Sequence, residues 1–218
     1  SKIELPPGTN IKTEGLSIKY PELGKFKDNR IVLLDSAGLE TPILNLNNQN
    51  NLYDYKVNEL FREKSREKII TEFFLQNYII NNSDILIVVV GILTYSEQKL
   101  LMKIKKEIER SKINIPLFII HNLITYTSVQ QVQDYICEFL LKSATFNLEE
   151  GHEISTKIKT GIYYYESNKA QKIYHLILAN EGSEAGKYYN QFTLDFLENN
   201  YPSITYLKPF DVTETIKD

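Results

Sequence analysis

The chain has 218 residues, of which 42% are hydrophobic and 24% are charged, a composition typical of one globular domain with a sizeable core. Its formal net charge of -3 gives no reason to expect broad electrostatic contact with nucleic acid or with an acidic membrane surface. The sequence has one cysteine, Cys137, so no intramolecular disulfide can form, and we expect a buried thiol and a cytoplasmic protein. No apolar stretch reaches the ~18 residues of a membrane span, and residues 1–20 lack the pattern of a signal peptide.

The first third of the chain predicts a hairpin followed by a long helix. Residues 15–20 alternate as in a half-buried strand, and residues 30–34 form a fully apolar, buried one. The segment between them contains the Pro, Gly and Asp-Asn of a turn, so the two strands are expected to pair. From Asn58 to Ile80 the apolar residues follow a helical period, with Asn58 placed to cap the helix.

Strands and helices alternate through the rest of the chain. Further strands are predicted at 84–93, 116–120, 161–166 and 172–179, the first of them covered on both faces. Helices are predicted at 96–110, 129–141 and 184–199. Residues 143–160 are expected to be irregular. This order predicts a three-layer α/β fold with a mainly parallel sheet over residues 1–200 and an extended tail over 201–218.

The strand at 30–34 ends in D-S-A-G, which suits a phosphate and magnesium site. Ligands of open α/β sheets bind at the carboxyl ends of the strands. There Asp35 could hold a hydrated Mg²⁺, while Gly38 would let a backbone N–H approach the terminal phosphate. Upstream, Thr13 could offer its hydroxyl to the same ion. Taken singly, the D-x-x-G is more simply a turn leaving a strand, and Thr13 a solvent-facing loop residue.

Taken together, the two motifs resemble those in the G domains of P-loop GTPases, within them the guanylate-binding-protein and atlastin branch of the dynamin-like superfamily. The matching positions are Thr13, Gly15 and Leu16, then Asp35, Gly38 and Leu39. The resemblance implies that Thr13, Asp35, Ser36 and Gly38 bind the nucleotide, with Thr13 and Asp35 as ligands of Mg²⁺. Leu39 stands where Ras-like GTPases place a water-orienting glutamine, so hydrolysis would need a group from elsewhere.

The motif that recognises guanine departs from the pattern of the resembled family. That motif is usually N-K-x-D, and the corresponding loop of this chain reads H-N-L-I-T-Y. Asn122 would stand for the asparagine and bind the base, although a simple loop-capping role explains it equally well. Thr125 replaces the aspartate and cannot make the paired carboxylate contact to guanine. His121 is expected to be a hydrogen-bonded residue at the end of a strand.

The phosphate loop, G-x-x-x-x-G-K-[ST], is the larger departure. In the resembled family it lies on the first strand and helix, ahead of the position of Ser1, so that strand and loop are missing or supplied by another segment. The nearest internal candidate, E-G-S-E-A-G-K-Y-Y at 181–189, has glycines one residue too close together. We interpret it as the loop beside the base, with Ser183 capping the next helix.

The sequence therefore predicts a guanine-nucleotide-binding protein that takes GTP or GDP with Mg²⁺. Hydrolysis would be slow or would depend on assembly, with copies of itself or with a protein partner. The alternative is a pseudo-GTPase that keeps the fold as a scaffold and turns over no nucleotide, which Leu39, H-N-L-I-T-Y and the absent phosphate-loop lysine favour. An unrelated flavodoxin-like module is a third possibility. Neither nucleic-acid binding nor membrane association is expected from this chain.

Overall fold

The computed structural model describes residues 16–19, 32–36, 55–111, 115–153, 161–166 and 172–200. The chain divides into two compact units, Ser1–Ile79 and Ile80–Asp218. Thr13, Gly38 and the tail from Tyr201 lie outside the described residues.

The N-terminal unit contains the predicted hairpin and most of the predicted helix. Strands β1 (Leu16–Lys19) and β2 (Leu33–Ser36) pair antiparallel, as expected. The expectation that the second strand is buried is wrong, because Leu33 is 45% exposed and the rest of β2 is only half-buried. A two-stranded ribbon cannot cover its own faces.

Helix α1 (Tyr55–Asn82) confirms the predicted long helix and begins three residues before Asn58, so Asn58 lies within the helix and not at the predicted N-cap position. Its periodic apolar residues do not form a covered stripe in the structure. Side chains that are 50–68% exposed are Phe61, Ile69, Ile70, Phe73 and Phe74.

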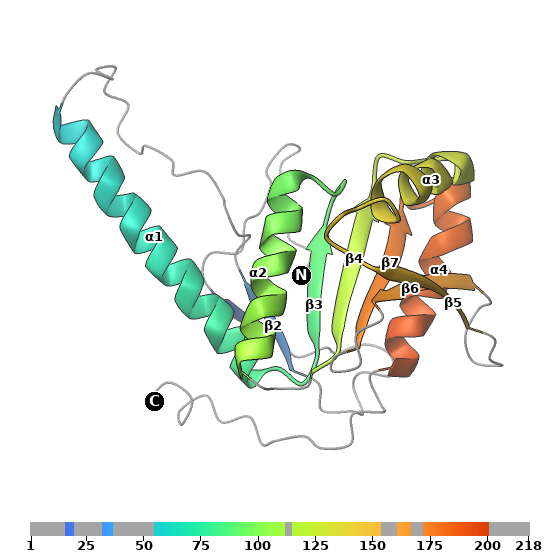
Figure 1. The fold of residues 1–218 in the computed structure, drawn as a ribbon, viewed down its shortest axis with the longest axis horizontal. Coiled ribbons are helices and arrows are strands. Elements are labelled where there is room, and N and C mark those ends of the chain that lie inside the picture. The colour runs from blue at the N-terminus through green and yellow to red at the C-terminus, as the bar shows by residue number, and fades with distance from the viewer. Residues whose placement is uncertain are drawn as a thin grey trace, which may run out of the picture. The chain divides into compact units, whose positions relative to one another are not determined.

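The C-terminal unit is built on a five-stranded sheet with the order β3-β4-β7-β6-β5 (Figure 1). The strands are β3 (Leu86–Val90), β4 (Leu117–Leu123), β5 (Leu148–Glu153), β6 (Gly161–Glu166) and β7 (Ile173–Ala179). β3, β4 and β7 run parallel, whereas β6 and β5 add antiparallel strands at one side. The predicted α/β class is thus confirmed, and the parallel arrangement holds for the β3-β4-β7 half of the sheet.

The expectation that residues 143–160 are irregular is wrong, because β5 occupies Leu148–Glu153. This strand is polar and contains a glycine, so it lacks the apolar alternation that reveals a strand. Packing explains why position 151 is a glycine. A Cβ there would lie 2.4 Å from the ring of Tyr163 on the paired strand β6, so the aromatic ring covers the glycine backbone.

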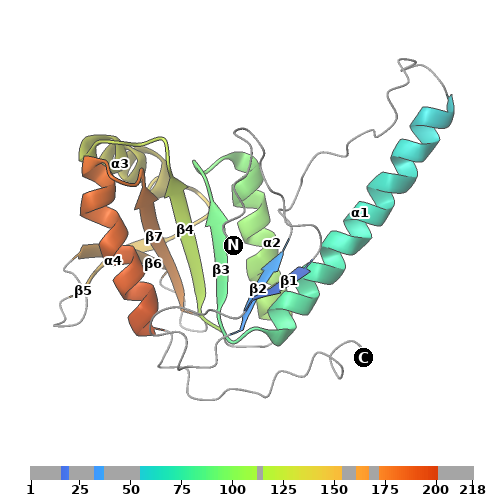
Figure 2. The ribbon, with the colours of Figure 1, turned by 180° about the vertical axis from the view of Figure 1, so that it is seen from behind.

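Helices cover both faces of this sheet, which gives the unit three layers. Helix α2 (Tyr95–Ser111) and helix α3 (Val129–Tyr135) lie on one face, and helix α4 (Glu184–Asn200) lies on the other (Figures 1 and 2). The helix predicted at 129–141 is not uniform. It continues beyond Tyr135 as a π-helical turn, η2 (Ile136–Leu140), in which Cys137 is exposed and not buried as expected.

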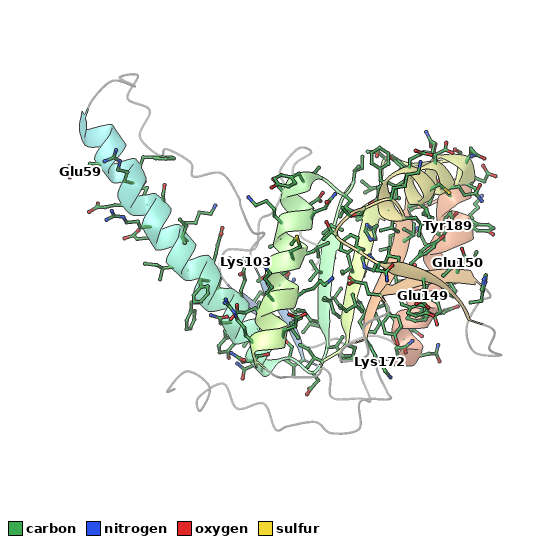
Figure 3. All side chains as sticks on the ribbon, in the orientation of Figure 1. Glu59, Lys103, Glu149, Glu150, Lys172 and Tyr189 are labelled. Carbon is green, nitrogen blue, oxygen red and sulfur yellow. The ribbon has the colours of Figure 1, made fainter. Side chains whose placement is uncertain are left out.

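The α4 side of the sheet holds an aromatic core. Phe118, Ile120 and Leu176 from the strands pack with Phe192, Phe196 and Leu197 from α4. In Figure 3, Tyr189 marks the α4 layer and Lys103 the α2 layer. β3 is the end strand of this sheet, and Ile87 and Val89 on it are 37% and 60% exposed. The expectation that this strand is covered on both faces is therefore wrong for the described residues.

Candidate functional site

Three loops follow the parallel strands and lie at the same edge of the sheet. They contain residues 91–94 after β3, 124–128 after β4 and 180–183 after β7. Because β3, β4 and β7 are parallel neighbours, their carboxyl ends converge on this edge (Figure 1). In open α/β folds the carboxyl edge is where ligands bind, which makes this edge a candidate site.

The loops after β4 and β7 are joined by hydrogen bonds. The side-chain amide of Asn180 donates to the carbonyl of Ile124 at 2.8 Å, and its backbone N–H donates to the carbonyl of Tyr126 at 3.1 Å. The N–H of Ala185 donates to the carbonyl of Thr127 at 3.0 Å. These bonds hold the two loops together as one surface.

Asn122 lies on this edge as an exposed residue of β4, not in a loop. The strand continues to Leu123 because His121 and Leu123 face the buried layer, with 0% and 1% exposure. The side chain of Asn122 alternates with theirs and is exposed, and Thr125 in the following loop is exposed as well. The strand therefore presents an asparagine, but no carboxylate, where guanine recognition was considered.

The segment 181–187 does not have the conformation of a phosphate loop. A phosphate loop directs several backbone N–H groups at its ligand. Here the N–H groups of Ser183, Ala185 and Lys187 donate to carbonyls of the protein, and that of Gly186 donates to the Ser183 hydroxyl at 3.1 Å. This last bond confirms Ser183 as the cap of α4.

The two glycines of this segment have different structural roles. Gly182 has a φ of 80°, a backbone conformation that L residues rarely adopt. Gly186 lies against the end of β7, where a Cβ would be 2.1 Å from the carbonyl oxygen of Asn180. The glycines therefore serve a turn and a close helix contact.

The loop after β3 is closed by a carboxylate of the protein itself. Glu97 accepts hydrogen bonds from the N–H groups of Gly91 and Thr94, both at 2.7 Å, and from the Thr94 hydroxyl at 2.9 Å. The N–H of Glu97 donates back to that hydroxyl at 3.3 Å, which completes a capping box at the start of α2. An anion of the protein thus occupies the N-terminus of this helix.

Asp35 and Ser36 belong to the N-terminal unit, where both lie within β2 and Asp35 does not follow the strand as expected. Asp35 pairs with Ser17 in the register of the hairpin. Its Oδ2 accepts a hydrogen bond from the ammonium of Lys19 at 2.8 Å, in an ion pair whose side chains are 44% and 58% exposed. The carboxylate that we considered a metal ligand is therefore in contact with a lysine.

A hydrogen-bond chain of polar side chains crosses the buried face beneath α2 and α3, and it was not predicted from the sequence. His121 on β4 and His175 on β7 are both 0% exposed, and His121 Nε2 lies 3.0 Å from His175 Nδ1. His121 Nδ1 lies 2.9 Å from the hydroxyl of Tyr135 on α3. The expectation that His121 is a hydrogen-bonded strand residue is confirmed, although its partners come from other elements.

The hydrogen-bond chain continues from His175 to an ion pair at the edge of the buried layer. His175 Nε2 lies 3.4 Å from Glu166 Oε1 on β6, and the other carboxylate oxygen accepts from Lys105 on α2. At the opposite end, the N–H of Leu93 donates to the Tyr135 hydroxyl at 3.3 Å. Four side chains, from α3, β4, β7 and β6, thus link the loop after β3 with Lys105 on α2.

Burial determines the charge states of the side chains in this hydrogen-bond chain. It lowers the pKa of His121 well below the usual value, and the neighbouring His175 lowers it further. Burial also lowers the pKa of His175, although the Glu166 carboxylate opposes the shift. Burial would raise the pKa of Glu166, but hydrogen bonds from His175 and Lys105 outweigh it, and the pKa is lowered. These pKa directions favour neutral imidazoles at His121 and His175 and a charged carboxylate at Glu166.

The sequence contains a weak signal for this hydrogen-bond chain of side chains. In K-I-Y-H-L-I-L-A at 172–179, His175 interrupts an otherwise apolar strand, and His121 similarly ends P-L-F-I-I-H. A polar residue at a core position of a strand calls for a partner. The partners, Tyr135, Glu166 and Lys105, come from separate elements, so only the tertiary structure identifies them.

The described residues contain no group of three or more His, Cys, Asp or Glu side chains arranged to hold a metal ion. Within the same part of the chain, no helix combines the length and the apolar character needed to cross a membrane.

Comparison with known proteins gives one informative similarity. The chain is similar to a heat shock protein of Dictyostelium discoideum, with 27% identity over 199 residues. The aligned region covers 88% of this chain and 27% of the relative, so the chain spans about a quarter of that protein's length. No family model matches the chain. No solved structure matches it either.

Proposed function

We propose that this chain belongs to a G-domain-like nucleotide-binding protein that takes GTP with Mg²⁺, and that its C-terminal unit binds the base. The observation that carries the proposal is the carboxyl edge of β3, β4 and β7, where Asn122 is exposed beside two loops tied together by Asn180. Parallel strands linked by helices, with a polar side chain at this edge, suit a nucleotide base.

The other proposed nucleotide-binding residues, Thr13, Asp35, Ser36 and Gly38, belong to the N-terminal unit, with Thr13 and Asp35 as the ligands of Mg²⁺. A Mg²⁺ ion that approaches Asp35 would have to displace Lys19, whose ammonium is 2.8 Å from the carboxylate. This exchange is feasible because both side chains are substantially exposed and such ion pairs contribute little. In this proposal Thr13 supplies the hydroxyl ligand and Gly38 the backbone contact to the terminal phosphate.

The experiment is a titration of the longest natural polypeptide that contains this chain with fluorescent GTP and ATP, with and without Mg²⁺. Binding of GTP that requires Mg²⁺ and is lost in Asp35→Ala and Thr13→Ala would support the proposal. Asn122→Ala should weaken GTP binding, whereas Asn147→Ala, which removes an exposed asparagine elsewhere, should not. Intact protein that binds neither nucleotide would refute it.

A second candidate is a pseudo-GTPase scaffold that turns over no nucleotide. Two observations favour it: Lys19 neutralises Asp35, and the N–H groups of segment 181–187 and of the loop after β3 bond to the protein. Lys19→Met distinguishes the candidates. If Lys19 competes with Mg²⁺ for Asp35, this variant should bind GTP with Mg²⁺ more tightly than the unmodified protein. If the protein is a scaffold, neither form should bind.

A further inference from the structure

The hydrogen-bond chain from Lys105 to Leu93 has one allowed direction when both histidines are neutral. The ionised Glu166 carboxylate can only accept, so His175 Nε2 carries a hydrogen and donates to it. His175 Nδ1 is then an acceptor, and His121 must donate from Nε2. His121 Nδ1 accepts in turn, so the Tyr135 hydroxyl donates to it while its oxygen accepts from the Leu93 N–H.

One additional proton is incompatible with this direction. A proton on His175 would make both of its ring nitrogens donors, so His121 Nε2 would have to become an acceptor. His121 would then carry its hydrogen on Nδ1 and donate to the Tyr135 oxygen. The Tyr135 hydroxyl hydrogen would lose its acceptor and would have to turn away from His121, so the hydroxyl would no longer be held in the orientation in which it accepts from the Leu93 N–H.

We propose that this hydrogen-bond chain is an acid-sensitive latch, in which proton uptake at His175 releases the N–H of Leu93 from the Tyr135 hydroxyl while Glu97 still holds Gly91 and Thr94. The proposal rests on the hydrogen-bond geometry and goes beyond the proposed nucleotide site. It gives the carboxyl edge a device that responds to pH from within the fold. The π-helical turn η2 begins directly after Tyr135, and such turns are frequent at functional sites.

His175 is the histidine that receives the first proton, because of the groups that face it. Glu166 on β6 lies 3.4 Å from its Nε2 and favours the cation, whereas Lys105 on α2 opposes it. Tyr164 pairs with His175 across β6 and β7, and the Phe146 ring covers its imidazole edge-on. His121 has only His175 and the Tyr135 hydroxyl as polar partners among the contacts that the structure gives.

The direction of the hydrogen bonds is tested first by nitrogen NMR on the full-length polypeptide labelled with ¹⁵N-histidine. At pH 7.5 both buried rings should be neutral with the hydrogen on Nε2. The exposed His152 is the third histidine of the chain, and His152→Gln assigns its signals without disturbing the buried pair. A hydrogen on Nδ1 of either buried ring at pH 7.5 would overturn the proposal.

The release of Leu93 is tested by amide hydrogen exchange at pH 7.5 and 5.0, corrected for intrinsic exchange rates. Protection of the Leu93 amide should fall about fivefold at the lower pH, as expected for the loss of one hydrogen bond. The Leu86 amide, which donates to Pro116 at the other end of β3, should stay protected. In Tyr135→Phe, Leu93 should be poorly protected at both pH values.

Two results would contradict the latch. One is unchanged protection of Leu93 at pH 5.0 while His175 gains its proton. The other is simultaneous loss of protection at Leu93 and Leu86, which would mean that the unit admits the proton only by unfolding.

Discussion

His121 and His175 share a hydrogen bond of 3.0 Å between two imidazoles that are both 0% exposed. They belong to neighbouring parallel strands, and Ile119 is the register partner of His175, so the two side chains meet diagonally on one face of the sheet. Because neither imidazole is exposed, burial is the main cause that lowers the pKa of each and favours its neutral form.

Stability should therefore decrease as the pH falls below ~6.5, the ordinary pKa of histidine. Because both folded-state pKa values are lowered, the unfolded chain binds protons more readily than the folded one, and this contribution is complete above ~6.5. Each histidine can remove up to about 1.4 kcal/mol per pH unit until the pH passes its folded pKa. Urea denaturation at pH 7.5, 6.5 and 5.5 measures this slope.

The exposed histidine provides the control for this pH dependence. His152→Gln should retain the full loss of stability, because His152 is exposed on β5 and contacts the exposed Glu150. A free energy of unfolding that stays constant from pH 7.5 to 5.5 would show that the buried pair is not kept neutral.

Lys105→Met should destabilise the protein by about 3 kcal/mol, because it leaves the largely buried Glu166 carboxylate without its cation. Adding Glu166→Gln to this variant should recover much of the loss, since the amide removes the charge and still accepts from His175. Thermal or urea denaturation of the two single variants and the double variant measures the coupling. Lys142→Met removes an exposed pair with Glu138 and should change stability by less than about 0.5 kcal/mol. Equal effects of Lys105→Met and Lys142→Met would refute the argument.

Gly186→Ala should be far more disruptive than Gly182→Ala, by about 3 kcal/mol against about 1 kcal/mol. The added methyl at Gly186 would meet the backbone oxygen of Asn180, which cannot move without separating α4 from β7. At Gly182 the methyl meets nothing within 4 Å, and only the positive φ opposes it. Gly182→Asn should restore most of the stability, since asparagine tolerates this conformation. The reverse order of the two alanine variants in thermal denaturation would contradict this packing.

Glu97→Ala should cost about 2 kcal/mol, because the N–H groups of Gly91 and Thr94 lose a charged acceptor at the start of α2. Glu97→Gln should cost less, since its amide oxygen can still accept. The far-ultraviolet circular dichroism of both variants should stay close to that of the unmodified protein, with the difference appearing in the denaturation midpoint. A Glu97→Ala variant as stable as the unmodified protein would show that water replaces the carboxylate at no cost.

The sequence by itself determined the elements whose signals are local. The helices at α1, α2 and α4 follow the 3.6-residue period, and the apolar runs predict β3, β4 and β7. Ser128 and Gln131, which have the S-x-x-Q spacing of a capping box, form one at the start of α3. Each of these depends on side chains a few residues apart, so a window of the sequence contains the cause. Strand β5 was not predicted, because a polar strand with a glycine has no such local pattern.

The tertiary structure decided which residues meet, and hence the chemistry. His121, Tyr135, Glu166 and His175 lie on four different elements, and the spacing between them along the chain carries no periodic signal. Only the pairing of β4, β6 and β7, with α3 laid across them, brings their polar atoms within hydrogen-bond distance. The same holds for the ion pair of Asp35 with Lys19, because the hairpin register places that lysine beside the carboxylate. Burial then sets the charges, and burial is a property of the whole packed unit.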